Sequence, residues 1–104
     1  MSFIFAYITT KDKEQALFLG KTLVQEHLCA CVNIIDPMTS IYRWEGRIAT
    51  ESETVLIAKT TAEKFDALQN RVKELHSYSC PCVVSIPLTN GSAQYLEWLS
   101  DNLR

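Results

Sequence analysis

The most reactive side chains of this 104-residue chain are four cysteines, which form two C-x-C pairs. The first pair consists of Cys29 and Cys31, and the second of Cys80 and Cys82. Side chains alternate along an extended chain, so this spacing places both sulfurs of a pair on one face. Four thiolates suit a tetrahedral zinc ion, although structural zinc pairs usually have C-x2–4-C spacing, and soft thiolates also suit Cu(I). The cysteine pattern therefore indicates a metal site built from thiols.

A simpler interpretation is that some of these cysteines are small buried residues. Free cysteine is among the most buried residue types, and this interpretation applies first to Cys31 and to one of Cys80 and Cys82. A disulfide within either pair is not expected, because i,i+2 partners on an extended chain lie near the upper limit of the workable Cα separation.

His76 lies four residues before Cys80 and close to Tyr78, which makes it a further candidate metal ligand. A cation at the end of a helix also suits the helix dipole, so a plain helix-end role is the alternative. Cys31 or Cys80 could act as a nucleophile, but no orienting acid or oxyanion hole stands in recognisable spacing. The sequence also has no Gly-rich phosphate loop, no H-E-x-x-H and no G-x-S-x-G. We therefore expect a binding protein and not an enzyme.

The first half of the chain alternates between extended and helical patterns. A strand is predicted from Phe3 to Thr9, followed by a helix with apolar recurrence at three- and four-residue spacing. The residues of that recurrence are Ala16, Leu17, Gly20, Leu23, Val24 and His27. Gly20 weakens a helix by about 1 kcal/mol unless close packing needs the missing side chain. A second extended stretch runs from Cys31 to Trp44, and Pro37 within it implies a bulge or an edge position.

The second half repeats the pattern. Glu45 and Gly46 begin a connection, and residues 53–60 read as the returning strand of a hairpin. Thr60 and Glu63 have the spacing of a capping box for a second helix. Its apolar stripe consists of Phe65, Leu68, Val72 and Leu75. A last strand over residues 83–88 precedes a terminal helix that Ser92 caps.

This order, β-α-β-β-α-β plus a terminal helix, predicts an α+β fold of the ferredoxin-like kind. Two helices then cover one face of a four-stranded antiparallel sheet. The second and fourth strands of that arrangement lie at opposite edges. One chain would therefore hold its two C-x-C pairs apart, and a joint site would require edges of neighbouring subunits to meet.

The stretch from Val32 to Trp44 is too long for the body of such a domain. It would reach ~43 Å at ~3.3 Å per residue. A compact chain of this length has a diameter of roughly 30–35 Å. The hairpin should project, and its Ile41, Tyr42 and Trp44 would be costly to leave exposed as a patch. A second subunit that covers them is the simplest explanation.

Length and composition limit the classes of protein to which the chain can belong. The length allows one domain over residues 1–104. The chain has 10 basic and 12 acidic residues and a net charge of −2, which gives no electrostatic basis for nucleic-acid binding. No apolar run approaches the ~18 residues of a membrane span, and no signal peptide is recognisable. We expect a cytoplasmic protein.

Several stretches of the sequence together resemble the CutA divalent-cation tolerance family. They are residues 31–35 (CVNII), 38–42 (MTSIY), 44–46 (WEG), 59–60 (KT), 74–76 (ELH) and 95–98 (YLEW), with Tyr78 and Pro81. The resemblance covers essentially the whole chain. It implies a ferredoxin-like protomer in a homotrimer similar to the PII signalling proteins, with long hairpins that wrap adjacent subunits. It also implies a link to copper and other divalent cations, and no established reaction.

The resemblance also implies which residues surround the clefts between subunits. They are Cys31, Tyr42, Trp44, Glu45, Lys59, His76, Tyr78 and Trp98. Where the family commonly reads H-P-Y-E-x-P-E, this chain has H-S-Y-S-C-P-C over residues 76–82. Two acidic positions are thus Ser79 and Cys82, which removes hard oxygen ligands and adds sulfur, so a softer, copper-like metal preference becomes more plausible.

Two functions follow as hypotheses. In the first, a trimer binds copper or another divalent metal ion through His76, Cys31, Cys80 and Cys82. In the second, a PII-like sensor binds a small anionic ligand in the cleft between subunits through Lys59 and the aromatic residues.

Overall fold

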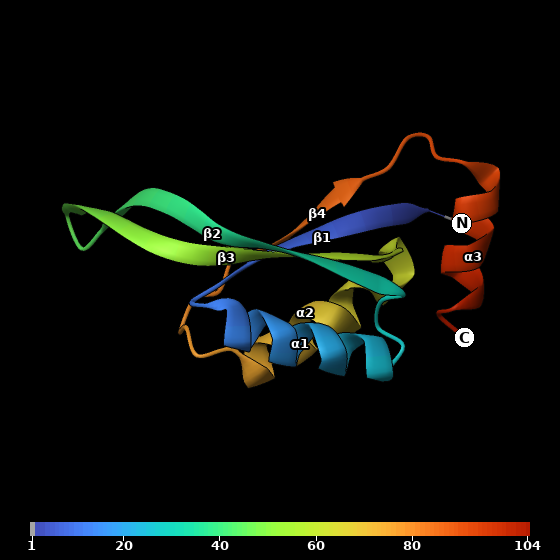
Figure 1. Ribbon diagram of the computed structural model, residues 1–104, viewed down its shortest axis with the longest axis horizontal. Coiled ribbons are helices and arrows are strands. Elements are labelled where there is room, and N and C mark those ends of the chain that lie inside the picture. The colour runs from blue at the N-terminus through green and yellow to red at the C-terminus, as the bar shows by residue number, and fades with distance from the viewer. Residues whose placement is uncertain (1) are drawn as a thin grey trace.

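The computed structural model describes residues 2–104, and its elements follow the predicted order. They are β1 (Phe3–Thr10), α1 (Lys13–Gln25), β2 (Cys31–Trp44), β3 (Arg47–Thr61), the 3-10 helix η1 (Ala62–Lys64), α2 (Phe65–Leu75), β4 (Val83–Pro87) and α3 (Ala93–Asp101). The strands form one antiparallel sheet in the order β2-β3-β1-β4. Helices α1 and α2 lie together on one face, and α3 stands at one end of the sheet (Figure 1). The ferredoxin-like α+β prediction is confirmed, including the placement of β2 and β4 at opposite edges.

Alternation along β1 separates the core from the other face of the sheet. Its even-numbered residues are buried, and Ala6 and Ile8 pack with apolar side chains of α1 and α2. Gly20 lets α1 approach the sheet closely, because a Cβ at this position would lie 2.9 Å from Cγ2 of Val32. The close packing that justifies a helical glycine is therefore present.

The predicted inner face of α1 was partly wrong. Leu19 is fully buried, whereas Leu17 and Val24 are exposed. The helix begins at Lys13, after Asp12 accepts a hydrogen bond from the Gln15 amide at 2.8 Å, and its buried side carries Ala16, Leu19, Gly20 and Leu23. His27 lies beyond the helix end with φ 59°, so it does not extend the apolar stripe.

The capping box at Thr60 and Glu63 was also wrong. Thr60 belongs to β3, and its hydroxyl donates to the Leu28 carbonyl at 2.8 Å. Helix α2 begins only at Phe65, after η1, without a side-chain cap. The hydroxyl satisfies a carbonyl of the loop after α1, and that tertiary bond takes precedence over local capping. The cap of α3 is confirmed, since Ser92 Oγ accepts from the Tyr95 amide at 3.4 Å.

Strands β2 and β3 form a hairpin that extends beyond the helices (Figure 1). Pairing continues to Trp44 opposite Arg47, and the two-residue turn between them has φ 50° at Glu45 and φ 78° at Gly46. Positive φ at both positions is the mark of a tight hairpin turn. The molecule measures 45 × 25 × 22 Å, which confirms the projection. The bulge implied by Pro37 is present as a register shift between Ile35 and Met38.

Strand β3 starts at Arg47, six residues earlier than predicted. Within residues 2–104, no helix combines the length and the apolar character needed to cross a membrane.

Candidate functional site

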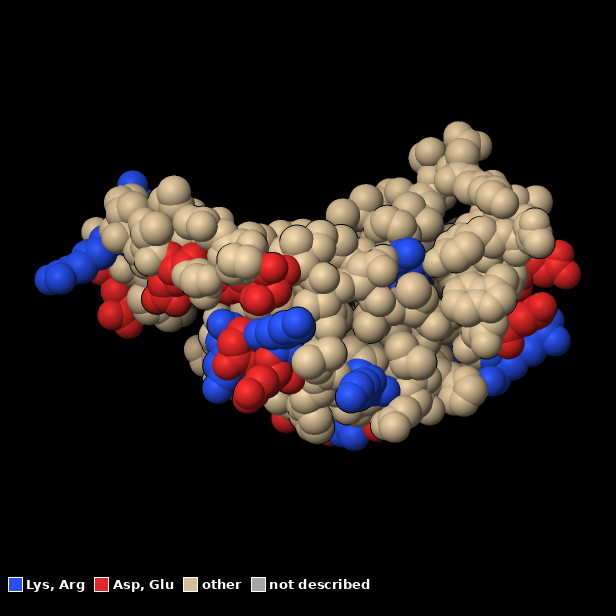
Figure 2. Space-filling model, in the orientation of Figure 1, with Lys and Arg blue, Asp and Glu red and all other residues tan. Residues whose placement is uncertain are grey.

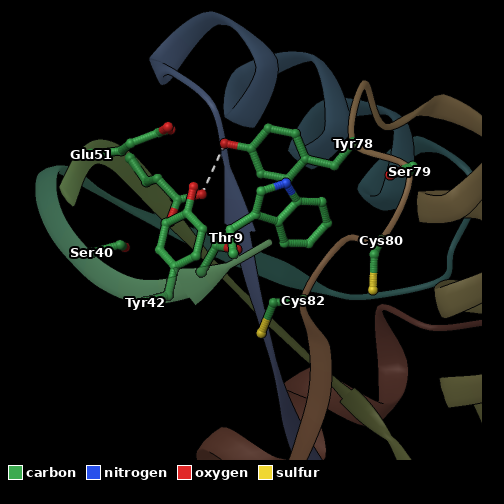
Figure 3. Close-up of a pocket in the computed structure, with 10 residues that line it drawn as sticks. Thr9, Ser40, Tyr42, Glu51, Tyr78, Ser79, Cys80 and Cys82 are labelled. Carbon is green, nitrogen blue, oxygen red and sulfur yellow. Dashed lines mark hydrogen bonds between the residues drawn. The ribbon is translucent and has the colours of Figure 1, made fainter. Parts of the chain in front are cut away.

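A pocket of about 490 Å³ lies where the hairpin meets the segment that follows α2 (Figure 3). Strand β1 contributes one residue to it, the hairpin contributes five, and the segment before β4 contributes four. The lining residues are Thr9, Ser40, Tyr42, Trp44, Glu51, Glu53, Tyr78, Ser79, Cys80 and Cys82.

The hairpin register brings two carboxylates to this pocket. Glu51 and Glu53 alternate along β3 and therefore share one face of the strand. Glu53 is only 8% exposed, and its Oε2 accepts a hydrogen bond from the Tyr78 hydroxyl at 2.8 Å. Figure 3 shows the hydroxyls of Tyr42 and Tyr78 directed toward each other beside this hydrogen bond. The bond joins β3 to the segment after α2 and closes one wall of the pocket.

The electrostatic potential in the pocket is negative. Desolvation and then Glu51 raise the pKa of Tyr42, and desolvation followed by the hydrogen bond to Glu53 raises the pKa of Tyr78. Burial and then the charge of Glu53 raise the pKa of Cys82. None of the lining residues is Lys or Arg. Such a pocket attracts cations.

His76 anchors the segment that carries these residues. Its ring accepts a hydrogen bond from the Tyr78 amide at Nδ1, 3.0 Å away, so Nε2 carries the proton and donates to the Thr9 carbonyl at 2.8 Å. The residue is 9% exposed, and its ring centroid lies 4.7 Å from that of Tyr78. Both ring nitrogens are thus engaged, and the histidine ties residues 76–78 to the end of β1.

The four predicted metal ligands do not come together within one chain. Cys80 and Cys82 line the pocket, whereas Cys31 starts β2 opposite Lys59, at the far edge of the sheet. Across residues 2–104 no group of three or more His, Cys, Asp or Glu is placed to hold a metal ion.

The prediction of which thiols are buried was wrong. Cys29 is the fully buried one, Cys31 is half-buried, and both Cys80 and Cys82 are exposed. Cys29 packs in the main core because the turn after α1 directs it beneath the sheet, among the buried residues of α1 and α2.

The predicted cleft residues divide between two ends of the molecule. Tyr42, Trp44 and Tyr78 line the pocket, and Glu45 lies in the hairpin turn. Trp98 is on α3, and Lys59 lies close to that helix. Lys59 Nζ is 5.5 Å from the ring centroid of Tyr95, and Tyr95 stacks on Trp98 with centroids 5.7 Å apart.

The sequence interpretation missed Glu51 and Glu53. Their alternation in E-S-E, at residues 51–53, was the available signal, but Glu51 fell within what was expected to be a connection.

The buried thiol of Cys29 predicts a pH-dependent stability. Burial, and then the neighbouring Cys31, raise its pKa from an ordinary 9.0 to about 12. Between these values the unfolded chain releases a proton that the folded chain keeps, so stability falls as pH rises above 9. Between pH 8 and pH 10, we expect the free energy of unfolding of Cys29→Ala to fall by about 1 kcal/mol less than that of the unmodified protein. Urea denaturation at both pH values tests this, and equal losses in the two proteins would contradict it.

Comparison with known proteins gives a consistent result. The model of the family described as CutA1 divalent ion tolerance protein matches residues 4–102. The divalent-cation tolerance protein CutA of Thermus thermophilus is 45% identical over 95 residues, which is 91% of this chain and 92% of that protein. A chloroplastic CutA protein of Arabidopsis thaliana is 41% identical over 101 residues, 97% of this chain and 56% of its own length.

The structural comparison agrees. The structure of the periplasmic divalent cation tolerance protein CutA from Archaeoglobus fulgidus has a TM-score of 0.96 at 38% identity, covering 98% of this chain and 99% of that one. Because the named relatives include chloroplastic and periplasmic proteins, the cytoplasmic location stays a prediction. The extent of these matches leads to one conclusion: the chain belongs to the CutA divalent-cation tolerance family.

Proposed function

We propose that this chain serves divalent-cation tolerance as a homotrimer that binds copper or another divalent metal ion in the pocket beneath the hairpin. The donor set of the pocket is the observation that carries this proposal. The carboxylates of Glu51 and Glu53 share the pocket with the thiols of Cys80 and Cys82. Carboxylate oxygens and thiolates both bind metal ions, and their negative charge favours a cation. This function is binding and involves no reaction.

The uncovered face of the sheet supports the trimer. Val84 and Ile86 of β4 pair with Tyr7 and Phe5 of β1, so these four side chains share the face opposite the helices. Val84 and Ile86 are about half exposed. The surface between the hairpin and α3 is hollowed and almost free of charged side chains (Figure 2). An apolar sheet face with two open edges is suited to burial against further copies of the same chain.

Of the four candidate ligands, Cys80 and Cys82 are the pair best placed to bind a metal. His76 supports them by holding their segment against β1, since both its ring nitrogens already have hydrogen-bond partners. Cys31 would join them only from a neighbouring subunit, because in its own chain it lies at the opposite edge of the sheet.

The PII-like alternative, in which the cleft binds a small anion, is less favoured. Its one candidate cation, Lys59, lies between the rings of Phe5 and Tyr95, with Nζ 5.7 and 5.5 Å from their centroids. This position is near α3 and outside the pocket. The groups that line the pocket would repel an anion, so the sensor function requires a second cleft formed with another subunit.

A competition titration with Cu²⁺ and Zn²⁺ tests the proposed function. Glu53→Gln keeps the size of the side chain and an acceptor for the Tyr78 hydroxyl but removes the charge. We expect this change to weaken the affinity for both ions by about tenfold or more.

Glu97→Gln is the matched control, because Glu97 lies on α3, away from the pocket. Its affinity should equal that of the unmodified protein. The proposal is wrong if the unmodified protein binds neither ion, or if the two variants bind equally well.

A further inference from the structure

We propose that the pocket beside the hairpin also binds an organic cation, an alkylated ammonium group such as trimethylammonium, against the aromatic rings of Tyr42, Trp44 and Tyr78. All three residues line the pocket. The inference does not rest on the proposed metal binding, because the face of an aromatic ring attracts an ammonium group but offers a metal ion no carboxylate or thiolate. It assigns the pocket a second class of ligand.

Two of the rings stand beside the carboxylates on one face of the hairpin. Ser40 lies opposite Glu51, and Tyr42 and Trp44 follow Ser40 in steps of two residues along β2. Side chains two residues apart project from the same face of a strand, and so do directly opposed side chains of neighbouring strands. The rings of Tyr42 and Trp44 therefore share a face with Glu51 and Glu53.

Tyr78 supplies the third ring from a different part of the chain. Figure 3 shows Tyr42 and Glu51 on one side of the pocket and Tyr78 on the other. The hydroxyl of Tyr78 donates to Glu53 at 2.8 Å, and the segment that carries it is tied to β1 through His76. This ring is thus fixed in place before a ligand arrives, which reduces the entropy lost on binding.

The ring faces on the hairpin are open. Trp44 is 54% exposed and Tyr42 is 38% exposed. Within residues 2–104, neither ring packs against another aromatic ring or lies under a Lys or Arg cation. The contrast is the aromatic group at α3, where Tyr95 stacks on Trp98. The two rings of the hairpin therefore present electron-rich faces that can take a cation from solvent.

The charge and the size of the pocket favour an organic cation. Glu51 and Glu53 give it a negative potential, and none of its lining residues is Lys or Arg, so an anion is repelled. A volume of about 490 Å³ holds a small organic molecule. An alkylated ammonium group carries its positive charge on an apolar surface, which packs on ring faces and is attracted by their quadrupoles. Such a cation uses both the rings and the carboxylates.

Contact between chains through the other face of the hairpin does not fill the pocket. Ile41 and Ile48 are exposed and lie on the face opposite Tyr42 and Trp44. An association through these isoleucines leaves the rings of the pocket in place. Binding is therefore measured on the assembled protein.

The test is isothermal titration calorimetry on the assembled protein, freed of metal ions with EDTA, with three compounds. Choline carries a trimethylammonium group, and ethanolammonium has N–H groups in place of the methyl groups. In the third compound, an uncharged analogue of choline, a tert-butyl group replaces trimethylammonium. We expect choline to bind most tightly and the uncharged analogue at least about tenfold more weakly, because only choline combines the charge with methyl groups that cover the rings.

Variants of the two tryptophans locate the site. Trp44→Leu removes the most exposed ring of the pocket and keeps an apolar side chain, so we expect it to weaken choline binding by about tenfold. Trp44→Phe restores a ring face and should recover most of that loss. Trp98→Leu is the matched control, because Trp98 is an exposed tryptophan on α3, outside the pocket, and its loss should leave choline affinity unchanged. Circular dichroism and light scattering check that each variant keeps the fold and the assembly.

Three results would overturn the inference. They are no choline binding up to about 10 mM, tighter binding of ethanolammonium than of choline, and equal choline affinity in Trp44→Leu and Trp98→Leu.

The metal proposal can fail separately. Trp44→Leu should leave the affinity for Cu²⁺ unchanged, whereas Glu53→Gln should lower it. If Cu²⁺ binds with that dependence on Glu53 but choline does not bind, only the organic-cation site is wrong. If choline binds with dependence on Trp44 but neither Cu²⁺ nor Zn²⁺ binds, only the metal function is wrong.

Discussion

Replacing His76 with alanine is expected to lower the free energy of unfolding by about 2–3 kcal/mol. The ring is 9% exposed and makes two hydrogen bonds to the backbone, one with the Thr9 carbonyl and one with the Tyr78 amide. Alanine leaves both backbone groups without these partners and leaves a cavity beneath Tyr78. An unsatisfied buried polar group costs about 1–3 kcal/mol, and the lost packing adds to this.

Urea denaturation at one fixed protein concentration measures the change, since an oligomer's stability depends on concentration. His27→Asn is the matched control. His27 is exposed and has φ 59°, a conformation that asparagine tolerates. We expect the control to change stability by less than about 0.5 kcal/mol. If His76→Ala is equally mild, the histidine does not anchor its segment.

This anchoring role could not be read from the sequence. The position of His76 at the end of a helix and near two cysteines was visible, and it favoured metal binding. One of its two partners, the Thr9 carbonyl, lies on β1, 67 residues earlier in the chain. Only the packing of α2 beneath the sheet brings the ring to that carbonyl, and no local pattern encodes such a distant pairing.

The fold itself was predictable because its signals are local. Alternating burial in β1 and the Glu45-Gly46 turn follow from side-chain periodicity and from backbone preferences. The errors arose where a contact between residues distant in the sequence determines the local structure. Thr60 bonds to Leu28 and does not cap α2, and the packing of α1 on the sheet buries Leu19 and leaves Leu17 exposed.

Only part of the pocket could be predicted from the sequence, because some of its residues reach it through tertiary pairing. Cys80 and Cys82 were identified by type and spacing, and Tyr42, Trp44 and Tyr78 through the resemblance to the family. Glu51 and Glu53 reach the pocket only through the register of the hairpin, which shifts between Ile35 and Met38. A slip of one residue would turn both carboxylates to the other face of the strand. The bulge lies in β2, and its position decides which side chains of β2 share a face with the two carboxylates of β3.

The double variant Ile41→Glu/Ile48→Glu is expected to convert a trimer into separate chains. Ile41 is 70% exposed and Ile48 is 63% exposed in the single chain. Ile41 lies opposite Thr50 and Arg43 lies opposite Ile48, so both isoleucines share one face of the hairpin, while Trp44 is on the other. A hairpin that exposes large apolar side chains on both faces, beyond its own domain, needs another chain to cover them.

Burying these two side chains is worth about 3–6 kcal/mol per subunit, and charged replacements forfeit it, so association should weaken by roughly 10² to 10⁴-fold. Light scattering at micromolar concentration should give three times 11.8 kDa for the unmodified protein and 11.8 kDa for the variant. Phe18→Glu on α1, another exposed apolar position, should remain trimeric. An unmodified protein at 11.8 kDa, or a double variant that stays trimeric, would contradict the proposed assembly.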